Sequence, residues 1–100
     1  MPKKIDDKNT QNLAKAFVAI NSEEECIRFL TDLCTISEIK AMAQRFEVAV
    51  MLDKGKVYND IAAKTAASTA TISRVNRALT YGEDGYRIVL DRLGKELEDV

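Results

Sequence analysis

The sequence predicts an all-α fold of six helices, and three observations support this prediction. Apolar residues recur at helical spacing along almost the whole chain, and the alternation typical of strands is missing. One proline and four glycines among 100 residues favour long regular segments. A composition that is 46% hydrophobic and 31% charged is typical of a soluble globular protein. We therefore expect a single domain over residues 1–100, with residues 1–8 disordered.

The first helix is predicted from an apolar face on Leu13, Phe17 and Ile20, and it ends near Asn21. The motif SEEE at residues 22–25 then resembles a capping box. In such a box a serine hydroxyl accepts an amide proton and a glutamate three residues later reaches back. A second helix follows with an apolar face made of Ile27, Leu30, Leu33 and Cys34.

Either Thr35 or Ser37 can cap the third helix, and Gly55 supplies the left-handed residue that ends it. Its inner face consists of Ile39, Met42, Ala43, Phe46 and Val50. A short helix over residues 59–66, a break at Ala67 and Ser68, and a helix to about Thr80 are expected next. The last helix carries an apolar stripe made of Tyr86, Val89, Leu90, Leu93 and Leu97. Stripes this wide favour a homodimer that shares its core.

Composition and simple motifs weigh against several classes of function. A formal net charge of -1 gives no overall attraction to a polyanion, and no apolar run approaches the roughly 18 residues of a membrane span. Without a secretory signal, a cytoplasmic protein is expected, with Cys26 and Cys34 as reduced, buried thiols. The chain has no histidine, no glycine-rich phosphate loop and no nucleophile beside an evident base. We therefore expect no enzyme, no metal site and no cofactor.

Residues 58–79 fit a helix-turn-helix. Ile61 and Ala62 provide an aliphatic and a small residue where two helices cross, and Ile72 turns inward again eleven residues after Ile61. Val75 and Leu79 continue that inner face. Ser68 can cap the second helix and leave its amide-rich N-terminus facing a phosphate.

The expected outer face of that second helix consists of Thr69, Ala70, Thr71, Ser73 and Arg77. Such short side chains let a helix backbone approach base edges, and threonine methyls can meet the thymine methyl. Residues 54–80 also hold five basic residues and one acidic residue, so the near-neutral total hides a basic patch. DNA binding is the function predicted. The alternative is a helical module that keeps the fold and binds proteins, because such helix corners also occur in proteins that never touch DNA.

From Thr35 to about Leu93 the chain resembles the Trp repressor superfamily, and more narrowly its bacterial Trp-repressor-like proteins of unassigned effector. The resemblance rests on ATISR at residues 70–74, on AQRFEVAVML at residues 43–52 and on the break at Gly55. It implies an intertwined homodimer that binds a palindromic operator in double-stranded DNA. We expect a transcriptional regulator, and more narrowly a repressor. The predicted DNA-binding residues are Tyr58, Asn59, Lys64, Ser68, Thr69, Ala70, Thr71, Ser73 and Arg77.

The resemblance also implies a pocket for a small effector. Thr35, Arg45 and Arg74 occupy the places of the family's tryptophan-binding threonine and arginines. Val75, however, replaces a glycine against which the indole ring lies, and Ala78 replaces a serine of the pocket. We therefore expect that tryptophan is not the corepressor. An unknown small anionic effector and a purely structural role for the two arginines both stay open.

Overall fold

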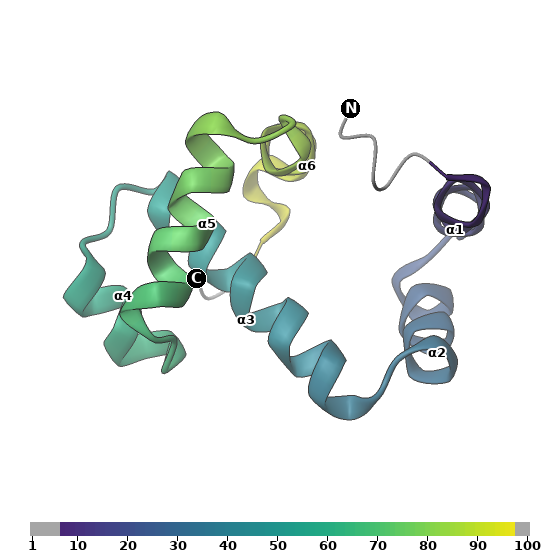
Figure 1. Cartoon of the computed structure of the whole chain (residues 1–100), viewed down its shortest axis with the longest axis horizontal. Coiled ribbons are helices and arrows are strands. Elements are labelled where there is room, and N and C mark those ends of the chain that lie inside the picture. The colour runs from purple at the N-terminus through teal and green to yellow at the C-terminus, as the bar shows by residue number, and fades with distance from the viewer. Residues whose placement is uncertain (1–6, 98–100) are drawn as a thin grey trace. The chain divides into compact units, whose positions relative to one another are not determined.

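The structure is a computed structural model that describes residues 7–97. Within this range it contains six α-helices and a 3₁₀-helix but no strand, as the sequence predicts (Figure 1). The helices are α1 (Lys8–Val18), α2 (Glu23–Leu33), α3 (Ile36–Asp53), α4 (Tyr58–Thr65), α5 (Thr69–Tyr81) and α6 (Gly85–Leu93), followed by the 3₁₀-helix Gly94–Glu96. None of these described helices is long and apolar enough to cross a membrane. The chain divides after Ile39 into two compact units.

Side chains cap the first two helices. The Asp7 carboxylate accepts a hydrogen bond from the Thr10 amide at 2.7 Å, so α1 begins at Lys8, inside the stretch expected to be disordered. Residues 1–6 of that stretch lie outside the described residues. At α2 the Glu25 amide donates to Ser22 Oγ at 3.1 Å, which confirms the serine cap. The Glu25 carboxylate accepts from the amide of Asn21 at 2.9 Å, one residue earlier than a capping box requires.

Thr35, and not Ser37, caps α3. Its hydroxyl accepts from the Glu38 amide at 3.1 Å, and its own amide donates to the Glu38 carboxylate at 2.8 Å. The hydrogen bond from the Thr35 amide holds the pKa of the Glu38 carboxyl below its usual value, because it stabilises the charged form. A reciprocal capping box therefore begins the longest helix of the chain.

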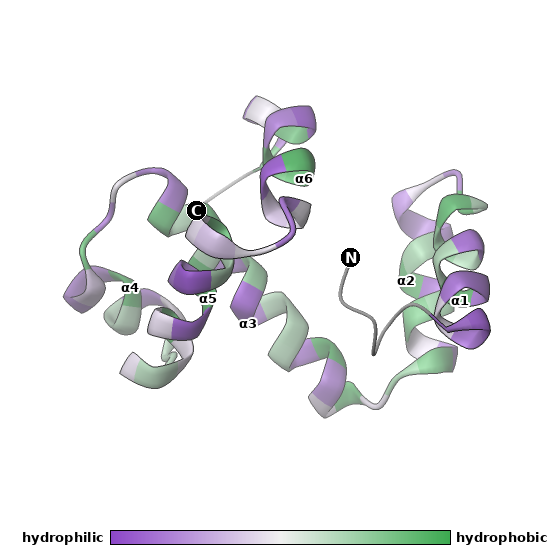
Figure 2. Ribbon diagram, turned by 45° about the horizontal axis from the view of Figure 1, so that its top comes forward, coloured by the Kyte–Doolittle hydropathy of each residue, from purple (hydrophilic) through white to green (hydrophobic). Residues whose placement is uncertain are grey.

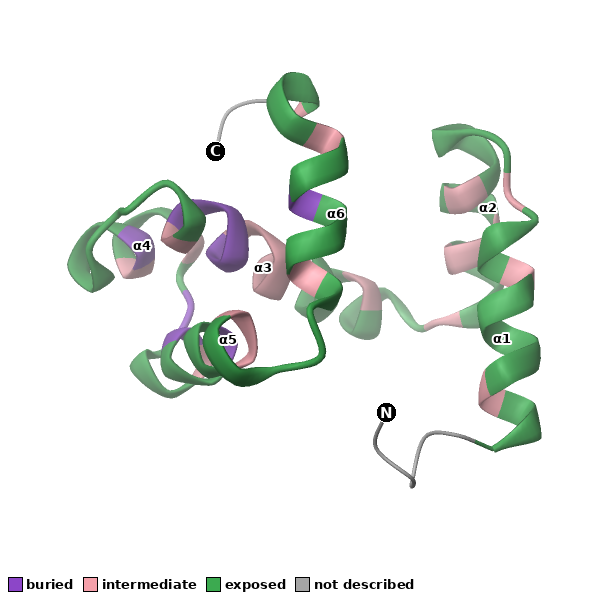
Figure 3. Cartoon of the chain, turned by 90° about the horizontal axis from the view of Figure 1, so that it is seen from above, coloured by how far each residue is buried: buried purple, intermediate pink, exposed green. Residues whose placement is uncertain are grey.

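The N-terminal unit leaves much of its apolar surface uncovered. Phe17 of α1 and Phe29 of α2 meet edge to face, with ring centroids 5.3 Å apart. Neither α1 nor α2 contains a buried residue, and apolar residues remain exposed among the polar ones (Figures 2 and 3). Val18 is 85% exposed, Ile27 63% and Leu33 49%. Such a large exposed apolar surface is typical of an interface.

The C-terminal unit contains the hydrophobic core. Gly55 follows the end of α3 at Asp53 and adopts φ 80°, the left-handed conformation expected there. This conformation lets the chain turn toward α4. α4 and α5 then lie side by side (Figure 1). The core cluster consists of Val48, Ala49, Met51, Ile61, Ala67, Ile72 and Val75. Helices α3, α4 and α5 therefore share one apolar centre.

Helix α6 is shorter than the sequence predicts. It ends at Leu93, because Gly94 turns the chain with φ 53°, and Leu97 lies beyond the 3₁₀-helix rather than on the apolar stripe. The Arg87 guanidinium bonds Asp53 at the end of α3 through both terminal nitrogens, at 2.7 and 3.2 Å. These bonds hold the pKa of the Asp53 carboxyl below its usual value. The ion pair is half-exposed, so it orients α6 more than it stabilises the fold.

Candidate functional site

Helices α4 and α5 form the predicted helix-turn-helix. Ile61 of α4 and Ile72 of α5 are both fully buried, and Val75 is 2% exposed beside them. Ala62 and Leu79 pack against the same cluster as half-buried residues. The aliphatic spacing that predicted the motif therefore corresponds to one shared core.

The turn between the two helices contains a residue in an unfavourable conformation. Ala66, which directly follows α4, has φ 61° and ψ 14°, in the left-handed region. That conformation costs a residue with a Cβ atom about 1–2 kcal/mol. The Thr65 hydroxyl stabilises the turn, because it accepts from the Ala67 amide at 3.1 Å and donates to the Ile61 carbonyl at 2.8 Å. Ala67 is buried, so the turn is tied into the core.

Ser68 caps α5 as the sequence predicts. Its Oγ accepts from the Thr71 amide at 3.1 Å, and its hydroxyl donates to Thr71 Oγ1 at 3.0 Å. Thr71 is half-buried, so it lies at the border of the inner face and not on the open outer face expected for it. The bond from Ser68 fixes the Thr71 hydroxyl at the start of the helix.

The other predicted DNA-binding residues lie on exposed positions. They are Tyr58, Asn59 and Lys64 on α4, Ser68 in the turn, and Thr69, Ala70, Ser73 and Arg77 on α5. Ala70, Ser73 and Arg77 lie opposite the buried pair Ile72 and Val75, given 100° per residue around the helix. The outer face of α5 is therefore short and polar near its N-terminus and basic one turn later.

Two arginines contribute most to the charge of this face. Arg74 and Arg77 are exposed on α5, and neither forms an ion pair or a side-chain hydrogen bond with another residue of the described range 7–97. Arginine combines a permanent positive charge with donors that suit phosphate oxygens. An exposed face of this kind can bind an anionic surface.

The four predicted effector residues have different environments. Thr35 belongs to the N-terminal unit, where its hydroxyl caps α3. Arg45 is half-buried on α3, and Arg74 is exposed on α5. Val75 is 2% exposed and packs in the core cluster, so its side chain fills space on the inner side of α5.

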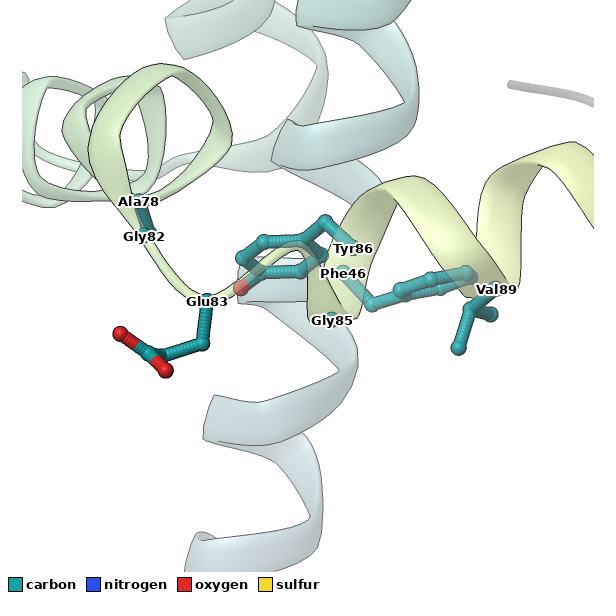
Figure 4. A pocket seen from close by; sticks show the side chains of 7 residues that line it. All are labelled: Phe46, Ala78, Gly82, Glu83, Gly85, Tyr86 and Val89. Carbon is teal, nitrogen blue, oxygen red and sulfur yellow. The ribbon is translucent and has the colours of Figure 1, made fainter. Parts of the chain in front are cut away.

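A pocket of about 560 Å³ lies elsewhere, between α3, the end of α5 and the start of α6. Its walls are largely apolar and consist of Phe46, Ala78, Gly82, Glu83, Gly85, Tyr86 and Val89. Figure 4 shows the rings of Phe46 and Tyr86 inside it, with the Glu83 carboxylate pointing away from them. None of the four predicted effector residues lines this pocket.

Sequence reasoning missed one contact at this site. The side-chain amide of Gln44, on α3, donates a hydrogen bond to the backbone carbonyl of Thr65 at 3.0 Å. Thr65 is the last residue of α4. No pattern in the sequence indicates this bond, because its acceptor is a backbone group and its two residues are 21 positions apart.

Comparisons with known proteins agree with this architecture. A family described as "Trp repressor protein" matches residues 8–94. An uncharacterised protein of Bacillus subtilis, YerC, is 50% identical over 95 residues, which cover 95% of this chain and 90% of that protein. A TrpR-like protein from Eubacterium eligens superposes with a TM-score of 0.89 at 49% identity, covering 98% of this chain and all of that one. A putative Trp repressor from Staphylococcus aureus gives 0.86 at 42% identity, with 91% of each chain covered.

Proposed function

The chain belongs to the Trp repressor family, and from this premise we propose that it is a sequence-specific DNA-binding transcriptional regulator in the cytoplasm that acts as a repressor. One observation carries the proposal: α5 buries Ile72 and Val75 in the core while Ser73 and Arg77 are exposed on its other side. A helix held in this way can enter the major groove with its outer face against the bases.

Six of the nine predicted contacts have a chemical role that their side chains suggest. Ala70 and Ser73 are small, so the α5 backbone can approach the base edges, and the methyl group of Thr69 can contact thymine. Arg77 lies one turn further along and reaches toward a phosphate. Asn59 and Lys64 on α4 extend the same basic surface toward the DNA backbone.

The regulator is a homodimer, and its two α5 helices bind the two halves of a palindromic operator. Support comes from two apolar surfaces within one chain. The N-terminal unit exposes Ile27 and Leu33, and the pocket of the C-terminal unit presents Phe46, Tyr86 and Val89. A second copy that covers both surfaces removes them from water.

If the protein is a homodimer, a charge placed in the interface between the two copies should weaken it. Ile27→Glu places a carboxylate where an apolar contact forms, so we expect the dimer dissociation constant to rise by at least about 100-fold. Light scattering after size-exclusion chromatography, repeated over a series of protein concentrations, measures this dissociation constant. Asn12→Glu adds the same charge at an exposed polar position of α1 and should leave the dimer intact. A wild-type chain that elutes as a stable monomer contradicts the proposal.

Arg77→Ala tests the DNA contact. Genomic fragments captured on the purified protein first supply the operator, and fluorescence anisotropy then measures affinity across a salt series. Because the dimer carries two copies of Arg77, we expect about tenfold weaker binding and a salt slope shallower by about 1.8. The fold should be unchanged, because the side chain is exposed.

Arg92→Ala on α6 is the matched control, since it removes the same charge from an exposed position outside the helix-turn-helix. It should change the salt slope by less than half as much. Equal losses for the two variants mean that only total charge matters and contradict the assigned face. Absence of binding by the wild-type chain even at low salt favours the alternative, a protein-interaction module.

A small anionic effector held by Arg45 and Arg74 remains part of the proposal for the regulator. Both arginines are on the C-terminal unit, and Arg74 is free to reorient because it is exposed. Tryptophan is a poor candidate for this role, because Val75 presents a branched side chain where the family's tryptophan-binding members have glycine.

A further inference from the structure

The turn of the helix-turn-helix is linked to α3 by a directional contact. Gln44 Nε2 donates to the Thr65 carbonyl at 3.0 Å, and both residues are half-buried. The last carbonyls of a helix have no partner within that helix. Gln44 therefore gives the half-buried end of α4 the hydrogen bond that solvent can supply only in part.

The other contacts beneath the motif are apolar. Ile61, Ile72 and Val75 keep α4 and α5 close to α3, but dispersion and burial depend little on direction. A hydrogen bond weakens steeply when its geometry is disturbed. It can therefore restrict the rotation of the turn in a way that the aliphatic contacts do not.

The position of this hydrogen bond matters because the turn determines how α5 begins. Thr65 precedes the left-handed Ala66, and only Ala67 and Ser68 separate that residue from α5. Ala66 has a left-handed conformation that is unfavourable for a residue with a Cβ atom. The turn can therefore relax when the contacts that hold it are lost. A change in the turn would alter the direction in which α5 begins.

We propose that Gln44 is a positioning residue for sequence recognition: its hydrogen bond to Thr65 sets the orientation of α5 relative to α3. The inference rests on the proposed DNA-binding function. The short side chains Ala70 and Ser73 contact base edges only at close range, so recognition tolerates little rotation of the helix. Phosphate contacts by long arginines tolerate more.

The test compares specific and non-specific binding. Gln44→Met keeps the length of the side chain without its donor, and Gln44→Glu keeps its shape with a carboxylate facing the carbonyl. We expect Gln44→Met to lower the ratio of specific to non-specific affinity by about fivefold, the effect of one neutral hydrogen bond, and Gln44→Glu to lower it further. The salt slope should be unchanged, because no phosphate contact is lost.

Hydrogen exchange without DNA provides a second readout. The Ile72 amide bonds the Ser68 carbonyl at 3.0 Å in the first turn of α5, and its exchange should accelerate in both Gln44 variants. Thr31→Val is the matched control, since it removes a 2.7 Å side-chain bond to the Ile27 carbonyl in α2. It should leave both the affinity ratio and the Ile72 exchange rate unchanged.

Each outcome has a distinct meaning. If wild-type protein binds its operator and both folded Gln44 variants keep its affinity ratio within twofold, the inference is wrong and the proposed function stands. If wild-type protein binds no duplex, the proposed function is wrong, and the proposed role of Gln44 in sequence recognition is wrong for that reason. Unchanged Ile72 exchange then also excludes Gln44 as the residue that holds α5. Circular dichroism identifies a variant that fails to fold, and the other variant then decides.

Discussion

Ile72→Ala is expected to lower the free energy of unfolding by about 3–4 kcal/mol. Ile72 is fully buried and packs in the cluster that contains Val48, Ile61 and Val75. Truncation removes three carbon atoms from the centre of the helix-turn-helix. The cavity cannot close easily, because α4 and α5 are already held together by the short turn between them. Urea unfolding at fixed protomer concentration measures the loss.

A graded series separates the cavity from other causes. Ile72→Val should cost about 1 kcal/mol, because it removes a single methylene from the same site. Val57→Ala, at a residue that is 61% exposed and makes no capping bond, should change stability by less than about 0.5 kcal/mol. An Ile72→Ala loss no larger than that of Val57→Ala would show that this core does not hold the motif.

The N-terminal caps of the helices were the most predictable part of the fold, because caps are local interactions. Ser22 and Ser68 each accept a hydrogen bond from an amide three residues ahead, so their role depends on residues next to them in the sequence. The end of α6 was predicted wrongly. Leu97 continues the apolar period, but Gly94 turns the chain first, and periodicity alone carries no information about that turn.

The helix-turn-helix was predictable for a similar reason, since the spacing of Ile61 and Ile72 lies within one supersecondary unit. The hydrogen bond of Gln44 could not be predicted, because its partner is the backbone carbonyl of Thr65, which comes close to Gln44 only in the folded chain. The resemblance predicted which residue types occupy the positions of an effector pocket. It did not predict what surrounds each of them, as the burial of Val75 illustrates. The predicted DNA contacts and effector residues stay predictions until binding is measured.

Gly82→Ala is expected to destabilise the chain by about 3 kcal/mol, although Gly82 does not have a left-handed backbone. The reason is a close approach. A Cβ atom at Gly82 would overlap the carbonyl oxygen of Ala78, which also accepts a hydrogen bond from the Gly82 amide at 3.0 Å. Because the obstacle is backbone, the chain must shift where α5 ends, and α6 and its pocket shift with it.

Gly85→Ala is the matched control for this substitution, three residues later. A Cβ atom there meets nothing within 4 Å, and the residue begins α6, so alanine should be neutral or stabilising by up to about 1 kcal/mol. Thermal unfolding of both variants at one concentration measures the contrast, which corresponds to more than about 10 °C in Tm. Equal stability of the two variants would contradict the close packing at Ala78. If Gly85→Ala alone weakens the dimer, the pocket that Gly85 lines is filled by the second copy.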